Sequence, residues 1–113
     1  MYSLTIQHDL QTIHIKWDLE PLDPDDDYNI IFTNFSFTAQ SSDYNARLLE
    51  ENTSIGVYYK NIQIAQIHFH SERLIYFLQF IQSGAVVREF YLEEDVLEAK
   101  KKYAVVYDVM YAS

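Results

Sequence analysis

A run of aspartates before residue 30 is the densest group of chemically active side chains in the chain. Residues 1–30 hold seven carboxylates against Lys16 alone, and the whole 113-residue chain has a net charge of −9. The alternating carboxylates resemble a calcium loop, but Tyr28 stands where the sharp turn requires glycine and Asn34 where a bidentate glutamate is required. We therefore interpret the segment as an electrostatic contact surface for a basic partner, with a solvated loop as the alternative. The predicted contact residues are Asp18, Glu20, Asp23, Asp25, Asp26, Asp27 and Tyr28.

Two histidines, two residues apart, form a second candidate site. On a strand, His68 and His70 would project from one face with Cα atoms about 6.6–6.8 Å apart, a spacing at which two imidazoles can bind a divalent metal. A metal site needs a third ligand, which Glu72, His8 or His14 would supply if the fold brings one of them close. The alternative, which we favour, places both histidines on the polar outer face of a strand and predicts neither metal nor cofactor.

The sequence lacks the common catalytic motifs. Because it has no cysteine, disulfides, thiolate nucleophiles and cysteine-bound metals are excluded. Its two glycines, Gly56 and Gly84, are too few for a phosphate-binding loop, a dinucleotide fingerprint or a nucleophile elbow. Adjacent acids such as Glu50-Glu51 and Glu93-Glu94 are typical of solvated surface. We therefore expect a protein that is not an enzyme.

Ten tyrosines are the remaining compositional signal. Tyrosine is amphipathic and enriched at protein interfaces, and a small core cannot satisfy ten hydroxyls, so several tyrosines should be exposed. The adjacent Tyr58 and Tyr59 must point to opposite sides of their strand. The sequence thus favours an acidic, tyrosine-bearing contact surface.

Charge and hydropathy restrict the partners. The acidic balance argues against direct nucleic-acid binding, which requires basic patches, and it favours a basic protein surface as the complement. Polar residues interrupt Met1–Leu10, so no signal-peptide pattern begins there, and no apolar stretch approaches the roughly 20 residues that span a bilayer. We expect a cytoplasmic protein that binds no membrane.

Alternating apolar and polar residues predict a β-rich fold. A hairpin through His8–Leu10 joins the first two strands, and Lys60-Asn61 fits a two-residue hairpin turn. The face that is apolar changes near Ala65, which predicts a bulge or burial on both faces. Residues 18–28 read as a loop, and residues 40–52 as a short helix or an irregular crossing. The expected strands are 2–7, 11–17, 28–38, 54–59, 62–69 and 85–92.

Helical spacing appears twice in the second half of the chain. Leu74, Phe77, Leu78 and Ile81 predict a helix over Ser71–Gln82, ended by Gly84. A second amphipathic helix is predicted from Glu93 to Met110, with strand as the alternative over residues 103–111. Its apolar positions are Leu92, Val96, Ala99, Tyr103, Val106 and Met110.

These elements predict a single α+β domain over residues 1–113. It would consist of a mostly antiparallel sheet of five or six strands, with one or two helices from the C-terminal half packed on one face. By analogy of size and charge with immunity proteins and phage-encoded inhibitors of host defence, we expect a binding module that covers the basic surface of a nucleic-acid-handling protein. The alternatives are a small metal-binding protein or enzyme centred on His68 and His70, and a structural homo-oligomer, for example a homodimer, built through the tyrosines and the C-terminal segment.

Overall fold

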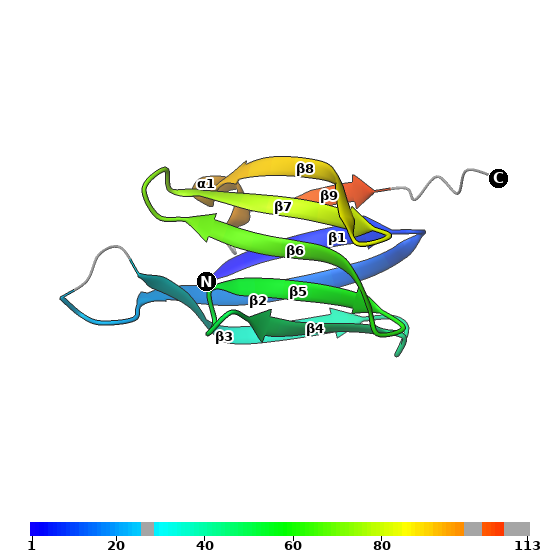
Figure 1. The fold of residues 1–113 in the computed structure, drawn as a ribbon, viewed down its shortest axis with the longest axis horizontal. Coiled ribbons are helices and arrows are strands. Elements are labelled where there is room, and N and C mark those ends of the chain that lie inside the picture. Colours follow the sequence, from blue (N-terminus) through cyan, green and yellow to red (C-terminus); the bar gives the residue numbers. More distant parts are fainter. Residues whose placement is uncertain (26–28, 99–102, 108–113) are drawn as a thin grey trace.

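A computed structural model describes residues 1–25, 29–98 and 103–107, and it contains two β-sheets and one short helix (Figure 1). In chain order the elements are β1 (Tyr2–His8), β2 (Gln11–Pro21), β3 (Ile30–Ala39), β4 (Tyr44–Leu49), β5 (Ser54–Tyr59), β6 (Ile62–His70), β7 (Ile75–Gln82), β8 (Ala85–Glu93), α1 (Glu94–Leu97) and β9 (Ala104–Tyr107). The expectation of a mostly antiparallel β protein is confirmed. The prediction of one sheet covered by helices is wrong. The described strands form two sheets, and the second sheet covers the first where helices were expected.

The two sheets pack face to face. One has the strand order β3-β2-β1-β9 and the other β4-β5-β6-β7-β8. All neighbouring strands in them are antiparallel except β1 and β9, which are parallel. The core between the sheets is centred on Trp17 of β2 and Tyr76 of β7, whose rings lie 5.5 Å apart and whose Nε1 and hydroxyl groups are joined by a 3.2 Å hydrogen bond. This contact fixes one sheet against the other.

Three tight turns are made with backbone conformations that usually favour glycine. Asp9 and Leu10 join β1 to β2 with φ of 48° and 64°, and Lys60 and Asn61 join β5 to β6 with φ of 50° and 68°. Positive φ at both central residues is the geometry whose twist matches that of the flanking strands. Both hairpin predictions are confirmed. Gly84, predicted to end a helix, instead lies in the turn between β7 and β8.

Strand β5 is buried on both of its faces. Its inward residues lie in the core, and its outward Gly56 is covered by Leu49 and Tyr58, to which an added Cβ would come within 2.7 and 3.0 Å. The predicted bulge in the following strand is confirmed, because the β5–β6 register shifts between Val57 and Tyr58, opposite Ala65. Tyr58 and Tyr59 point to opposite sides as predicted, since Tyr59 packs on core Tyr44 while Arg47 covers the Tyr58 ring.

The helix predicted over Ser71–Gln82 is wrong. Residues 75–82 form strand β7, which pairs with β6 and β8 along its length, and residues 71–74 form the β6–β7 turn. Its inward residues are buried, and its outward Phe77 contacts the rings of His70 and Tyr91. A strand that is apolar on both faces contains the helical spacing by coincidence.

The long C-terminal helix is also wrong. Among its described residues, Glu94–Leu97 is the only helical part, and Ala104–Tyr107 is strand β9 at the edge of the smaller sheet, as the strand alternative predicted. Of the predicted helical stripe, Val106 points outward and is 57% exposed. Ala99 and Met110 lie outside the described residues.

The segments 18–28 and 40–52 are more regular than predicted. Strand β2 continues through Pro21, so the loop between β2 and β3 starts at Leu22, and β4 occupies the second segment. Lengthening of β2 places Asp18 and Glu20 on a strand paired with β3, while Asp23 and Asp25 stay in the loop. The acidic residues therefore extend from a rigid strand into its connection.

A histidine is buried at the end of β1. The Nδ1 atom of His8 lies 3.1 Å from the hydroxyl of Tyr44, and the same hydroxyl lies 3.3 Å from the His8 carbonyl oxygen. Burial lowers the pKa of His8 below its ordinary 6.5, and the charge of Asp9 opposes the shift only in part. The fold thus stabilises the neutral imidazole.

This histidine makes the stability of the fold pH-dependent. As the pH falls through about 6.5 the unfolded chain gains a proton at His8 before the folded chain does, so the free energy of unfolding decreases below that pH. We expect the melting temperature to fall between pH 7 and pH 5, and to fall less in His8→Gln, which cannot be protonated. Equal pH dependence of the two proteins would contradict this assignment.

Candidate binding site at the acidic end

Alternate connections of the chain meet at one end of the sandwich. The β2–β3 loop, the β4–β5 turn, the β6–β7 turn and the β8–α1 junction all lie at the left in Figure 1, with the N-terminus. The Phe32 N–H of β3 donates to the Asn52 carbonyl of the β4–β5 turn over 2.8 Å, which links the two sheets, and Tyr2 of β1 pairs with Glu98 just after α1. Side chains distant in sequence are therefore brought together here.

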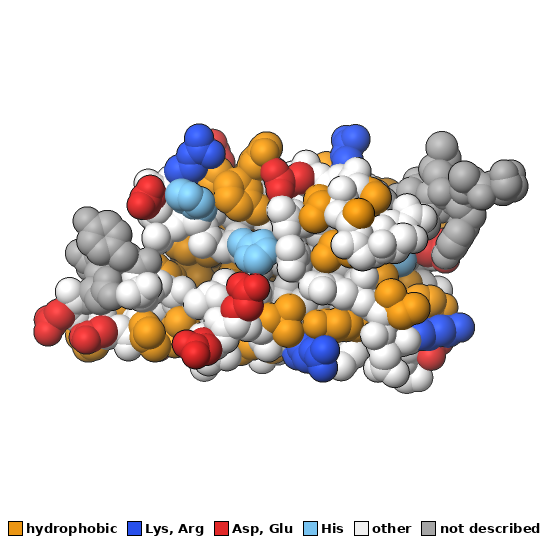
Figure 2. Space-filling view, viewed as in Figure 1, with side chains coloured by type: hydrophobic (Ala, Val, Ile, Leu, Met, Phe, Trp, Pro, Cys, Tyr) orange, Lys and Arg blue, Asp and Glu red, His pale blue; other side chains and the backbone are white. Residues whose placement is uncertain are grey.

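Carboxylates are concentrated at this end, which we call the acidic end. Figure 2 shows them mostly over the left half of the visible face. Arg73 and the N-terminal amine are also at this end, whereas the opposite end combines Asp9 and Asp43 with Lys60. The described carboxylates of the acidic end are Asp18, Glu20, Asp23, Asp25, Glu50, Glu51, Glu72, Glu93, Glu94, Asp95 and Glu98.

Asp18 is the rigid base of the predicted contact surface. Its carboxylate accepts a 2.9 Å hydrogen bond from Asn34 Nδ2 and lies 3.1 Å from the Met1 amine. The hydrogen bond from Asn34 and then that from the amine lower the pKa of Asp18. The fold itself therefore stabilises Asp18 as an anion. Because its carboxylate already accepts these contacts, it has less hydrogen-bonding capacity for a partner than the neighbouring acids.

The loop residues that were predicted as contacts are exposed. The Asp25 N–H donates to the Asp23 carboxylate over 3.1 Å, and the Leu22 N–H donates to the Asn29 carbonyl over 2.7 Å, which closes the loop. Asp18 and Glu20 lie on β2 rather than in the predicted loop, and Asp23 and Asp25 follow in the β2–β3 loop. The predicted contacts Asp26, Asp27 and Tyr28 lie outside the described residues.

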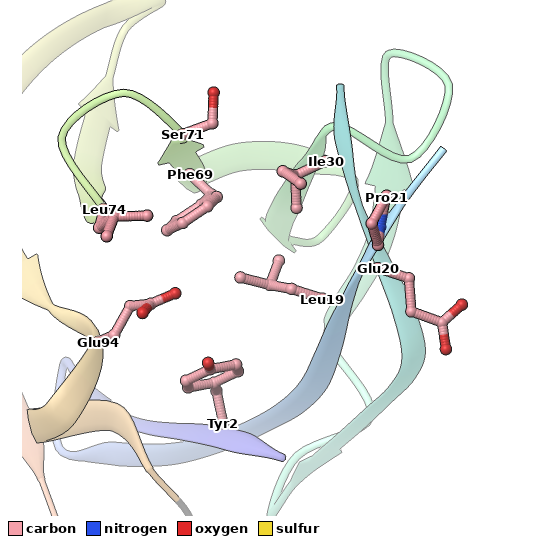
Figure 3. Close-up of a pocket in the computed structure, with 9 residues that line it drawn as sticks. All are labelled: Tyr2, Leu19, Glu20, Pro21, Ile30, Phe69, Ser71, Leu74 and Glu94. Carbon is pink, nitrogen blue, oxygen red and sulfur yellow. The ribbon is translucent and has the colours of Figure 1, made fainter. Parts of the chain in front are cut away.

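An apolar pocket opens within the acidic end, between strand ends of the two sheets (Figure 3). Its volume is about 180 Å³. Leu74, at its rim, is 58% exposed, and Leu22, in the neighbouring loop, is 62% exposed. Apolar groups surrounded by charged ones are typical of a protein-binding surface. The pocket is lined by Tyr2, Leu19, Glu20, Pro21, Ile30, Phe69, Ser71, Leu74 and Glu94.

Tyr2 and Glu94 place a polar pair inside this pocket. Both side chains point into it, whereas the Glu20 carboxylate points away (Figure 3). Burial, followed by the charges of Glu94 and Glu98 and a hydrogen bond to Glu94, raises the pKa of the Tyr2 hydroxyl. Tyr2 therefore stays protonated beside the Glu94 carboxylate.

Sequence reasoning missed most of this site. It interpreted Glu50, Glu51, Glu93 and Glu94 as ordinary surface and did not connect them with the aspartates of residues 18–27. A usable signal was present, because in an antiparallel arrangement every second connection lies at the same end, and the acids fall in those connections. Predicting a helix over 71–82 removed one strand, β7, and obscured that alternation.

The histidine pair lies on the outer face of the five-stranded sheet. His68 and His70 project from the same side of β6, and the His70 ring contacts that of Phe77 at 5.8 Å. Neither His8, which contacts Tyr44, nor His14, whose ring lies 3.1 Å from the Thr5 hydroxyl on the other sheet, is near them. Within residues 1–25, 29–98 and 103–107, no group of three or more histidines or acids is placed to bind a metal.

A hydrogen-bonded row of side chains crosses the same outer face. Gln66 Nε2 donates to Gln79 Oε1 over 2.6 Å, and Gln79 Nε2 donates to Glu89 over 2.5 Å. Hydrogen bonds from Tyr91 and from Gln79 lower the pKa of Glu89. Because these polar groups satisfy one another and join three strands, the row stabilises the sheet and leaves little hydrogen-bonding capacity for a ligand.

Comparison of the chain with protein-family models, with curated protein sequences and with solved structures gave no match. Over the described part of the chain, no helix has the length and apolar character needed to cross a membrane. The acidic end is therefore the feature of the molecule from which a function is inferred.

Proposed function

We propose that this chain is a non-enzymatic binding module whose acidic end covers a basic surface of a nucleic-acid-handling protein. One observation carries the proposal: carboxylates from four separate connections lie at the same end of the sandwich as an apolar pocket, whose lining includes Glu20 and Glu94. A dispersed array of negative charge complements a surface that binds phosphates. The exposed apolar groups within it supply the buried hydrophobic contacts of an interface, which electrostatic steering cannot supply.

In this proposal the chain is an inhibitor of the same general type as immunity proteins and phage-encoded anti-defence proteins. Such a module acts by occupying the partner's nucleic-acid site, so it needs no chemistry of its own. Long-range attraction between opposite charges would raise the association rate and make it dependent on salt.

The test compares two sets of neutral substitutions. The acidic-end variant carries Glu20→Gln, Asp23→Asn, Asp25→Asn and Glu72→Gln, and the control carries Asp9→Asn and Asp43→Asn at the opposite end. Proteins that the wild-type chain captures from cells of its source are purified, and association is measured against salt with and without a 20-base-pair DNA duplex. We expect a basic partner, competition by the duplex, and an association rate at low salt at least about tenfold lower for the acidic-end variant only.

Two results would reject the proposal. One is capture that is equally strong for the acidic-end variant and the wild type at low salt. The other is a partner that the duplex does not displace, because a partner bound outside its nucleic-acid site has not been covered in the proposed way. Thermal melting of each variant establishes that the fold is retained.

A further inference from the structure

The pocket at the acidic end combines aromatic walls with a single inward carboxylate. The Tyr2 ring is stacked on Trp17 with centroids 6.4 Å apart, and the Phe69 ring packs on Tyr76 at 4.8 Å. Both rings are therefore held in place by the core of the sandwich. Glu94, from the first residue of α1, points into the same space as Tyr2 (Figure 3).

This combination restricts the chemistry of an occupant. An anion would be repelled by Glu94, and a neutral apolar group would offer no opposite charge to the carboxylate. A cation with an extended, weakly hydrated body fits both features. The guanidinium group is planar, stacks on aromatic faces and offers paired donors to a carboxylate, whereas an ammonium is a compact and strongly hydrated charge.

We propose that the pocket binds an arginine side chain of the basic partner, with the guanidinium on the Glu94 carboxylate and the side-chain stem between Leu19, Phe69 and the Tyr2 ring. This inference rests on the proposed function and names the anchor of that interface. Tyr2 has a positioning role, because its ring forms one wall of the cavity that Glu94 faces and would orient the side-chain stem beneath the carboxylate.

Short peptides test the pocket without knowledge of the partner. The probes are acetylated and amidated pentapeptides with glycine at four positions and arginine, lysine or citrulline at the centre, together with free arginine amide. Binding is followed by chemical-shift changes of the Tyr2 and Glu94 amides and by fluorescence of Trp17, the single tryptophan, whose ring contacts Tyr2. Citrulline matches arginine in shape and lacks its charge.

We expect the arginine peptide to bind at least about tenfold more tightly than the citrulline peptide, and several-fold more tightly than the lysine peptide. Glu94→Gln should remove the preference for arginine over citrulline. The matched control Glu20→Gln, whose carboxylate points away from the pocket, should retain it.

Three outcomes would overturn the inference: equal binding of arginine and citrulline peptides, an unchanged preference in Glu94→Gln, or arginine amide binding more tightly than the peptide, which would indicate a small-molecule site. The acidic-end variant used above keeps Glu94, so the two proposals fail separately. If the purified partner binds Glu94→Gln as tightly as wild type but loses the acidic-end variant, the arginine anchor is wrong and the proposed function stands. If the arginine peptide binds more tightly than the citrulline peptide but the captured partner is not basic, the arginine pocket stands and the proposed function is wrong.

Discussion

Val105→Asp is expected to unfold the chain or nearly so, while Val106→Asp on the adjacent residue leaves it folded. Val105 of β9 is 4% exposed and pairs with Ile6 of β1, so an aspartate there would bury an unpaired charge. We expect a loss of roughly 3–5 kcal/mol in the free energy of unfolding for Val105→Asp, and about 0.5 kcal/mol or less for the outward Val106→Asp. Urea denaturation followed by circular dichroism measures both.

The same pair of variants tests the position of β9. A C-terminal helix of the kind that the spacing predicts would bury Val106, and Val106→Asp would then be the damaging substitution. Light scattering of Val106→Asp adds a test of the homodimer alternative. β9 lies at the edge of its sheet, and a charge on an edge strand opposes pairing with a second copy.

Trp17→Ala is expected to have the second large effect. The Trp17 ring packs edge-on against Phe32 and Tyr76, and its Nε1 donates to the buried Tyr76 hydroxyl. Truncation would open a cavity and leave that hydroxyl without its donor, at a cost of about 3–5 kcal/mol, which is a large part of the stability of a small domain.

Tyr91→Ala is the matched control for an aromatic side chain. Tyr91 lies on the outer face and is 64% exposed, with an edge contact to Phe77, so its loss should cost about 1 kcal/mol or less. Similar losses for Trp17→Ala and Tyr91→Ala would mean that the two sheets are not joined through Trp17.

The first part of the fold was predictable because its strands bury only one face. In β1 and in β2 up to Trp17, inward residues alternate with polar ones, and the turn between them followed from that pattern. β7 could not be recognised in this way. Phe77 and Ile81 are apolar on its outer face and Leu78 on its inner face, so the pattern matches helix and strand alike, and only pairing with β6 and β8 decides between them.

The concentration of aspartates was evident from the sequence, but the pocket was not. Its wall takes Tyr2 from the first strand, Leu19 from the second, Phe69 from the sixth and Glu94 from the helix. No local pattern relates residues so far apart in the chain. Their proximity follows from the packing of two sheets, which requires the number and order of the strands.

The parallel pairing of β1 with β9 has a mechanical consequence. Thr5 to His8 pair in register with Ala104 to Tyr107, and the Thr5 N–H also donates to the Tyr103 carbonyl over 3.2 Å. Because the strands run in the same direction, tension between the segment before β1 and the segment after β9 pulls along the shared strand axis. All of these hydrogen bonds then bear the load together in shear, whereas an antiparallel hairpin pulled from its open end would lose them one at a time. We therefore expect β9, the shortest of the described strands, to resist stretching together with β1.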